Sequence, residues 1–168
     1  MAVRTYTPPM ASVTAIFAGT FDPITLGHRD LITRGAALFD HVIVSVSRGG
    51  RRTLLDAETR LALVEHETQE LPGVRAELFE GLVVDQAARH GATVLLRGVR
   101  GARDLEYELQ MAYANRGMRP ALDSVFLPPS PALALISGTL VREVATLGGD
   151  VSAWVSPHVQ KVLEKAAK

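Results

Sequence analysis

The sequence predicts an α/β fold: one domain in which helices cover both faces of a doubly wound parallel sheet of about five strands. Short β-branched runs alternate with amphipathic segments along 168 residues, a length that fits a single domain. The runs lie at 13–17, 42–47, 74–79, 93–96 and 124–127, and several are apolar nearly throughout, as strands covered on both faces are. Because parallel strands need right-handed crossovers, this alternation indicates a Rossmann-like domain.

Amphipathic segments between these runs predict the helices. Helices are expected around residues 31–39, after the N-cap Asp56, over 103–116, on the segment carrying Arg142, and after Ser156 as N-cap with Pro157 as first helical residue. In the 103–116 helix, Leu105, Leu109 and Ala112 share one face, whereas Asp104, Glu108 and Asn115 share another. The last helix is expected to end the domain at the C-terminus.

Composition narrows the classes of protein that fit. Lys plus Arg equals Asp plus Glu at 18 each, so no global basic field exists to hold a nucleic acid. The chain has no cysteine, which excludes a disulfide framework and a thiolate metal site and suits the reducing cytoplasm. No apolar run approaches the roughly 18 residues that span a bilayer, so no membrane partner is expected.

Residues 1–12 are predicted to be a flexible leader and residues 13–168 the single folded domain. The leader contains Pro8 and Pro9, shows little periodicity, and lacks the apolar core of a secretory signal. Met10 is an alternative start to Met1.

The first constellation of candidate functional residues is the segment GTFDPITLGH, residues 19–28, which follows the first predicted strand. Gly19 permits a sharp turn and a close approach of backbone amides to an anion. Thr25 can cap the next helix, and Gly27 leaves room for phosphate at its N-terminus. His28 then lies in the first helical turn, where backbone N–H groups and the helix dipole favour negative charge.

The second constellation is Arg97-Gly98-Val99-Arg100, at the carboxyl end of the fourth predicted strand. Two arginines beside a glycine can fork around phosphate oxygens. A solvated basic turn is the alternative. Glu108, in the following helix, reads by itself as part of a charged helix surface.

The third constellation is Ile136-Ser137-Gly138-Thr139, which precedes the helix carrying Arg142. Hydroxyls and a glycine at a helix N-terminus form an anion site. Spacing alone leaves open whether Ser137 binds an anion or only caps the helix. Neither a G-x-G-x-x-G nor a Walker A pattern occurs, which disfavours dinucleotide oxidoreductases and P-loop NTPases.

These motifs resemble those of known proteins. Thr25-Leu26-Gly27-His28 matches the T-x-G-H signature of the nucleotidylyltransferase superfamily, and AGTFDPITLGH together with RGVRGARDLEYELQMAYANR resembles the phosphopantetheine adenylyltransferase family. The resemblance runs from about Thr14 to the last helix. It implies transfer of AMP from ATP to 4′-phosphopantetheine, giving dephospho-coenzyme A and pyrophosphate in coenzyme A biosynthesis.

The resemblance also implies roles for individual residues. His28 and Arg51 would stabilise the transition state, and Thr20, Arg51, Val83 and Arg97 would bind the acceptor. ATP would contact Thr20, Phe21, His28, Gly98, Val99, Arg100, Glu108, Leu133, Ala134, Leu135, Ile136, Ser137, Gly138 and Thr139. Mg²⁺ would accompany ATP, held by substrate oxygens and water, so no protein metal ligands are expected. A homohexamer in the cytoplasm and feedback inhibition by coenzyme A are further implications.

Two positions depart from the family pattern. Arg51 occupies the place of a family lysine, and Arg52 fills that place if the loop is shifted by one residue. Gly138 replaces a serine of the ISSS/ISST motif, so the position keeps its amide and loses a hydroxyl. Both departures favour, as an alternative, a nucleotide sensor without catalysis. The T-x-G-H turn also leaves room for another phosphorylated acceptor, such as nicotinamide mononucleotide or glycerol 3-phosphate.

Overall fold

The computed structural model describes residues 12–49 and 53–166 and contains a five-stranded parallel sheet. The strands are β1 (Thr14–Gly19), β2 (His41–Ser47), β3 (Val74–Phe79), β4 (Val94–Gly98) and β5 (Asp123–Leu127), arranged in the order β3-β2-β1-β4-β5. β1 pairs with β2 on one side and with β4 on the other, so the strand order reverses between β1 and β4. The doubly wound parallel sheet predicted from the sequence is confirmed.

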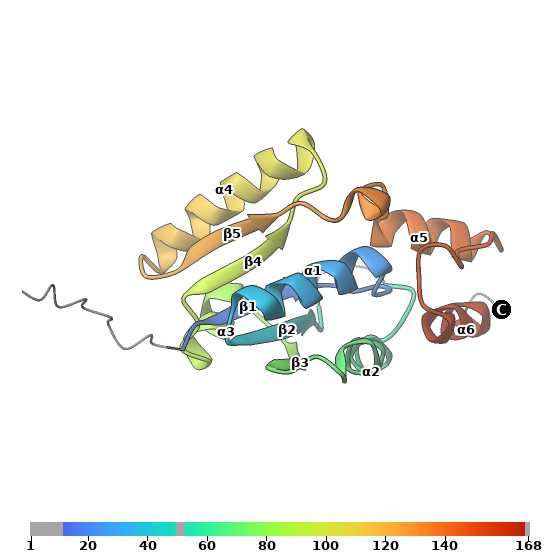
Figure 1. Cartoon of the computed structure of the whole chain (residues 1–168), viewed down its shortest axis with the longest axis horizontal. Coiled ribbons are helices and arrows are strands. Elements are labelled where there is room, and N and C mark those ends of the chain that lie inside the picture. The colour runs from blue at the N-terminus through green and yellow to red at the C-terminus, as the bar shows by residue number, and fades with distance from the viewer. Residues whose placement is uncertain (1–11, 50–52, 167–168) are drawn as a thin grey trace, which may run out of the picture.

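The helices connect and cover these strands (Figure 1). They are α1 (Leu26–Leu38), α2 (Ala57–Thr68), α3 (Val83–Arg89), α4 (Ala102–Met118), α5 (Gly138–Thr146) and α6 (Pro157–Ala166), with a short 3₁₀ turn at Pro131–Leu133. α5 and α6 lie together at one end of the molecule, and α4 lies along β5. Within the described ranges, no helix is both long enough and apolar enough to cross a bilayer.

Hydrophobic residues form one cluster on each face of the sheet. Side chains alternate along a strand, so neighbouring residues of β1, such as Phe17 and Ile16, enter different clusters. The larger cluster packs α1, α2, α5 and α6 against the sheet, and the smaller one packs α3. Helices therefore cover both faces, as the near-continuous apolar strands predict.

The predicted helix starts are confirmed by their caps. Asp56 accepts a hydrogen bond from the amide of Thr59 at 2.7 Å, and Ser156 accepts one from the amide of Val159 at 3.2 Å. α3 was not predicted. It has only seven residues, and its N-cap, Leu82, offers no side-chain acceptor.

α4 buries polar residues and exposes apolar ones, the reverse of what its sequence pattern predicts. The residues that α4 buries are Glu108 and Asn115, whereas Leu105 on its apolar face is exposed. The interpretation of Glu108 as part of a solvated helix surface is therefore wrong.

Candidate active site

A cavity of about 360 Å³ opens at the carboxyl ends of β1 and β4. This is the point at which the strand order reverses, where doubly wound sheets bind their ligands. Its walls come from the β1–α1 turn, the end of β4, α4 and the N-terminus of α5. The side chains and backbone that line it are Phe17, Ala18, Gly19, Thr20, Phe21, Asp22, Thr25, Gly27, His28, Leu31, Arg97, Gly98, Arg100, Glu108, Pro129, Ile136, Ser137, Gly138, Thr139 and Arg142.

The β1–α1 turn fixes His28 through a capping box. The Thr25 hydroxyl accepts a hydrogen bond from the His28 amide at 3.3 Å, and the Thr25 amide donates to Nδ1 of His28 at 3.1 Å. Phe21 lies in the turn with φ of 50°, a conformation that costs energy for a bulky side chain. Its ring packs edge-on against the imidazole, with ring centroids 5.2 Å apart. The imidazole is thus held from two sides.

His28 is neutral at physiological pH. Burial, and then the positive charge of Arg100, lower the pKa of His28 from 6.5 to about 4. Because Nδ1 accepts a hydrogen bond from the Thr25 amide, the ring proton of the neutral imidazole lies on Nε2. The free edge of the ring therefore presents a hydrogen-bond donor, which suits a phosphate oxygen.

Arg97 and Glu108 form a bidentate ion pair in the lining of the cavity. Nε and Nη2 of Arg97 donate to the two carboxylate oxygens of Glu108, each at 2.7 Å, and Nη1 donates to the carbonyl of Ala18 at 2.7 Å. Glu108 is buried because this pair compensates its charge. The pair also aims the Arg97 guanidinium along the end of β1.

The remaining positive charges lie at the rim. Arg100 pairs with Asp104 of α4 at 2.7 Å, and both side chains are partly exposed. Arg142 of α5 pairs with Asp22 at 3.2 Å. Ser137 caps α5 by accepting from the amide of Leu140 at 3.0 Å, and Gly138 and Thr139 line the cavity, so the N-terminus of α5 lies at the cavity wall. The cavity thus combines arginines, an imidazole donor and a helix N-terminus, an arrangement typical of a polyphosphate site.

A second cavity, of about 340 Å³, adjoins the first and shares five lining residues with it: Ala18, Gly19, Thr20, Arg97 and Glu108. Its walls are mostly apolar and come from β1, α3 and α4, including Val83 and Met111. The two cavities together offer a polyanion site joined to an apolar channel.

Comparison with known proteins identifies a matching family and similar relatives. The cytidylyltransferase-like family model matches residues 16–144. The phosphopantetheine adenylyltransferase of Methylococcus capsulatus is 48% identical over 153 residues, covering 90% of this chain and 94% of the relative. That of an Acidovorax species is 45% identical over 161 residues, covering 95% and 98%.

The chain belongs to the phosphopantetheine adenylyltransferase family.

Solved structures share its fold. A Vibrio parahaemolyticus protein provisionally described as a nicotinate-nucleotide adenylyltransferase superposes with a TM-score of 0.71 at 20% identity, covering 94% of this chain and 95% of that one. A bifunctional nicotinamide mononucleotide adenylyltransferase and ADP-ribose pyrophosphatase from Francisella tularensis, complexed with AMP and a manganese ion, gives 0.68 at 13% identity, covering 92% and 49%. At these identities the likeness supports the fold alone.

Most residues expected from the family motifs meet at the first cavity. Those that line it are Thr20, Phe21, His28, Arg97, Gly98, Arg100, Glu108, Ile136, Ser137, Gly138 and Thr139. Val83 lines the second cavity instead. Val99, Leu133, Ala134 and Leu135 line neither, and Leu135 is 90% exposed. Arg51 and Arg52 lie outside the described residues, so the choice between them stays open.

Two charged residues of the cavity wall, Asp22 and Arg142, were not among the predicted site residues. Asp22 lies inside the GTFDP segment but reads as an ordinary turn residue. Arg142 was noticed only as a marker of its helix. Each of these two residues lies next to a predicted phosphate-binding motif, which was the one signal that the sequence offered. Their contact with one another could not be predicted, because 120 positions separate them in the sequence.

Proposed function

We propose that this protein transfers the adenylyl group of ATP to 4′-phosphopantetheine, releasing pyrophosphate and forming dephospho-coenzyme A. The observation that carries the proposal is the polyanion cavity joined to an apolar channel at Thr20, Arg97 and Glu108. ATP matches the first part, and a phosphorylated acceptor with a long, weakly polar arm matches the second. Relatives named phosphopantetheine adenylyltransferase, 42–48% identical, support the same assignment.

The proposed reaction is a direct in-line displacement. A phosphate oxygen of the acceptor attacks the α-phosphorus of ATP, the new P–O bond forms, and the bond to the β-phosphate bridging oxygen breaks. The acceptor phosphate is mostly dianionic near neutral pH, because its second pKa is about 6. The nucleophile therefore arrives deprotonated, and no general base is required. The task left to the protein is to align two polyanions and stabilise the charge that develops on the α-phosphate.

We assign His28 to that developing charge. Its Nε2–H donates from a ring already oriented by Thr25 and Phe21, so little reorganisation accompanies the reaction. The α5 N-terminus, with Ser137 and Thr139, and the charges of Arg100 and Arg142 would hold the ATP phosphates. Arg51 is proposed as the second transition-state residue from its sequence position.

Arg97 is proposed to place the acceptor phosphate where the two cavities meet. Its three donor nitrogens each already have a protein acceptor, yet each terminal nitrogen keeps a second N–H for a phosphate oxygen. Glu108 then keeps the guanidinium at a fixed angle as the acceptor binds.

Magnesium is proposed as part of the substrate MgATP. The described residues contain no group of three or more histidines and carboxylates that could hold a metal ion. Of the two acids in the cavity wall, Glu108 is engaged by Arg97, and Asp22 by two amides and Arg142. Substrate oxygens and water would therefore supply most ligands of the ion.

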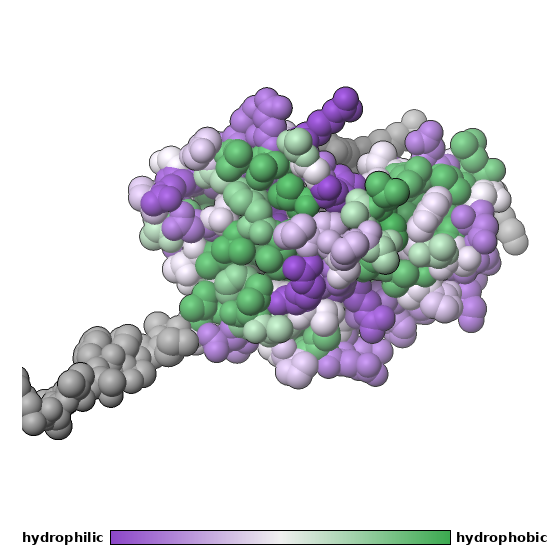
Figure 2. All heavy atoms as spheres, turned by 45° about the horizontal axis from the view of Figure 1, so that its top comes forward, coloured by the Kyte–Doolittle hydropathy of each residue, from purple (hydrophilic) through white to green (hydrophobic). Residues whose placement is uncertain are grey.

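A homohexamer, feedback inhibition by coenzyme A and a cytoplasmic location are proposed from the family. Support for assembly comes from α4, which exposes five large hydrophobic side chains: Leu105, Tyr107, Met111, Tyr113 and Met118. Figure 2 shows hydrophobic surface spread over the face on which α4 lies. Light scattering tests this proposal, with an expected mass six times the 18.1 kDa of the chain.

The direct test of the function is pyrophosphate release. The enzyme is incubated with ATP and Mg²⁺ and, in separate reactions, with 4′-phosphopantetheine, nicotinamide mononucleotide or glycerol 3-phosphate. Rapid pyrophosphate release is expected only in the reaction that contains 4′-phosphopantetheine as acceptor. Release with another acceptor alone would move the assignment within the superfamily, and ATP binding without release from any acceptor would favour a nucleotide sensor.

A further inference from the structure

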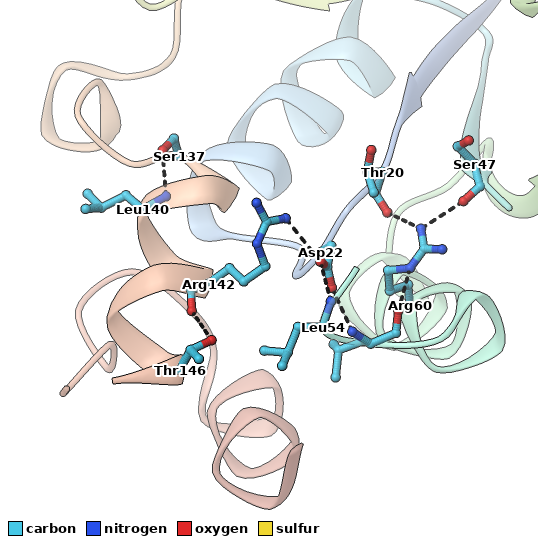
Figure 3. Close-up of polar contacts among 10 residues, drawn as sticks. Thr20, Asp22, Ser47, Leu54, Arg60, Ser137, Leu140, Arg142 and Thr146 are labelled. Carbon is cyan, nitrogen blue, oxygen red and sulfur yellow. Dashed lines mark hydrogen bonds and ion pairs between the residues drawn. The ribbon is translucent and has the colours of Figure 1, made fainter. Parts of the chain in front are cut away.

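Two buried charged side chains, Asp22 in the cavity wall and Arg60 behind it, have no part in the reaction proposed above. Asp22 belongs to the β1–α1 turn and Arg60 to α2, and the two residues are 4% and 1% exposed. Figure 3 shows the hydrogen bonds through which they join the turn, the loop ahead of α2 and α5. Burying an ion is costly unless it is paired and hydrogen-bonded, so each side chain requires an explanation.

Asp22 gathers donors from two other parts of the chain. One carboxylate oxygen accepts from the amide of Leu54 at 2.8 Å and from Nη1 of Arg142 at 3.2 Å, and the other accepts from the amide of Leu55 at 3.0 Å. Both oxygens are therefore engaged, and the side chain itself is only 1% exposed. Asp22 lines the cavity, and its carboxylate is occupied in holding Arg142 and the backbone of Leu54 and Leu55.

Arg60 holds the same stretch of chain from its other side. Its Nε donates to the carbonyl of Leu55 at 3.1 Å, and its Nη1 donates to the carbonyls of Thr20 at 2.5 Å and Ser47 at 2.9 Å. Leu55 is thus fixed at its N–H by Asp22 and at its carbonyl by Arg60. One guanidinium also joins the end of β1 to the end of β2.

The charges of the two residues support each other. Burial lowers the pKa of Arg60, and the charge of Asp22 is the largest influence that opposes this lowering. Buried charges add little net stability compared with apolar replacements, and here each charge holds the backbone and side-chain groups to which it is hydrogen-bonded. The groups fixed here include Thr20 and Arg142, both of which line the cavity.

We propose that Asp22 and Arg60 are positioning residues. They lock the β1–α1 turn, α5, and the residues Leu54 and Leu55 ahead of α2 into the one arrangement in which Thr20 and Arg142 meet the same phosphates. The inference rests on the proposed function, because the phosphates concerned are those of ATP and its acceptor. Neither side chain touches substrate.

The test is the effect of Asp22→Asn on the kinetics of pyrophosphate release. The amide keeps the size of the side chain but turns an NH₂ group toward donors. Misplacement of reacting groups by about 1 Å can cost about 10²-fold in rate. We expect kcat to fall about 10- to 100-fold, with KM for ATP changed less than about 3-fold.

A double-mutant cycle shows whether Asp22 acts through Arg142. If it does, Asp22→Asn costs much less in kcat in an Arg142→Ala background than in the wild type. Independent effects that multiply in full would overturn this part of the inference.

Val159→Ala is the matched control for stability. Val159 is buried in α6 and does not line the cavity, so its truncation destabilises the fold without touching the site. Both variants are assayed below the onset of their thermal unfolding. Val159→Ala should keep the wild-type kcat; if Asp22→Asn does so too, the positioning role is wrong.

Two measurements keep the test decisive. If Asp22→Asn does not fold, Arg60→Lys is tested in its place. Lysine keeps the buried charge but cannot bridge the three carbonyls that the guanidinium binds. The same fall in kcat is expected, and a wild-type kcat would contradict the proposal. Hydrogen exchange of the Leu54 and Leu55 amides needs no substrate: it should accelerate at least 10-fold in either variant. Unchanged hydrogen exchange would refute the positioning role of Asp22 and Arg60, whatever the activity of the wild type. A wild type that is inactive with 4′-phosphopantetheine would refute the proposed function separately.

Discussion

His28 is oriented by its own helix before any substrate arrives. The Thr25 amide occupies Nδ1 and fixes the tautomer, and the ring of Phe21 restrains the imidazole plane. Both restraints are local, since Thr25 and His28 are three residues apart. The placement of His28 at the cavity therefore follows from the T-x-G-H pattern itself: the motif is a capping box whose second member also lines the cavity.

We predict that His28→Ala lowers kcat at least about 10²-fold while the affinity for ATP changes only modestly, because a transition-state donor is lost. Steady-state kinetics and nucleotide titration measure the two effects. His158→Ala, in α6 and absent from the cavity lining, is the control and should keep the wild-type kcat. A loss of ATP affinity with kcat intact would make His28 a binding residue rather than a catalytic one.

The lowered pKa of His28 also predicts a pH dependence of stability. The folded chain keeps His28 neutral down to about pH 4, whereas the unfolded chain takes up a proton near pH 6.5. Unfolding therefore binds a proton in this window, and the free energy of unfolding falls as the pH drops from about 6.5 to about 4, by about 3 kcal/mol for the full shift. Above pH 6.5 the contribution is constant.

Urea unfolding at several pH values, compared between the wild type and His28→Gln, isolates this effect. The wild type should lose more stability than the variant between pH 6.5 and 4. Parallel profiles would show that the imidazole is not protected from protonation in the folded state.

At the scale of elements, the N-terminus of α5 accommodates the departure from the family motif at Gly138. A Cβ atom there would lie 3.5 Å from the carbonyl oxygen of Pro23 and 3.6 Å from Cε1 of His28, which are ordinary contacts. A serine therefore fits, and the glycine is not required by crowding. The proposed anion site at the N-terminus of α5 uses backbone amides, which are present with or without a hydroxyl at this position.

We predict that Gly138→Ser raises the free energy of unfolding by about 0.5 kcal/mol, because glycine is the poorer helix residue. KM for ATP should stay the same or fall, since a hydroxyl is added beside the phosphates. Thermal melts and steady-state kinetics check both expectations, and destabilisation by the serine would contradict the free space described at this position.

The connection between α2 and β3 is a second element-level constraint. Gly73 has φ of +73°, and a Cβ atom there would lie 2.5 Å from the carbonyl oxygen of Asp40. Its own carbonyl accepts from the amide of Val42, the first apolar residue of β2. The turn thus sets the register of β3 against β2.

Gly73→Ala is predicted to destabilise the protein by about 1–3 kcal/mol more than Gly91→Ala. Gly91 also has a positive φ, at +60°, but open space around its Cβ, so the comparison separates the backbone clash from conformational strain. Chemical denaturation measures the difference. Equal losses would mean that the Asp40 carbonyl moves aside at no cost.

The strands and most helices were predictable from the sequence because their signals are local. Apolar runs marked all five strands, and side-chain caps such as Asp56 marked helix starts. α3 escaped prediction because it is short and uncapped. α4 was predicted as a helix, but the burial of Glu108 depends on Arg97, a partner on a different element that periodicity does not reveal.

At the scale of the whole molecule, three motifs far apart in the sequence meet because the strand order reverses between β1 and β4. The meeting point could be predicted from the alternation of strands and helices, as could the His28, Arg97 and Ser137 neighbourhoods. The contacts that join these neighbourhoods could not, because Asp22 with Arg142 and Arg60 with Thr20 pair residues 120 and 40 positions apart. Long-range pairs of this kind leave no periodic signal in a single sequence.

The account depends most on the claim that this cavity aligns the α-phosphate of ATP with His28. A crystal structure with a non-hydrolysable ATP analogue and Mg²⁺ tests it directly. The expected result is an α-phosphate oxygen within about 3.2 Å of Nε2 of His28, with the β- and γ-phosphates at the N-terminus of α5. A nucleotide bound elsewhere, with no phosphate near His28, would contradict the account.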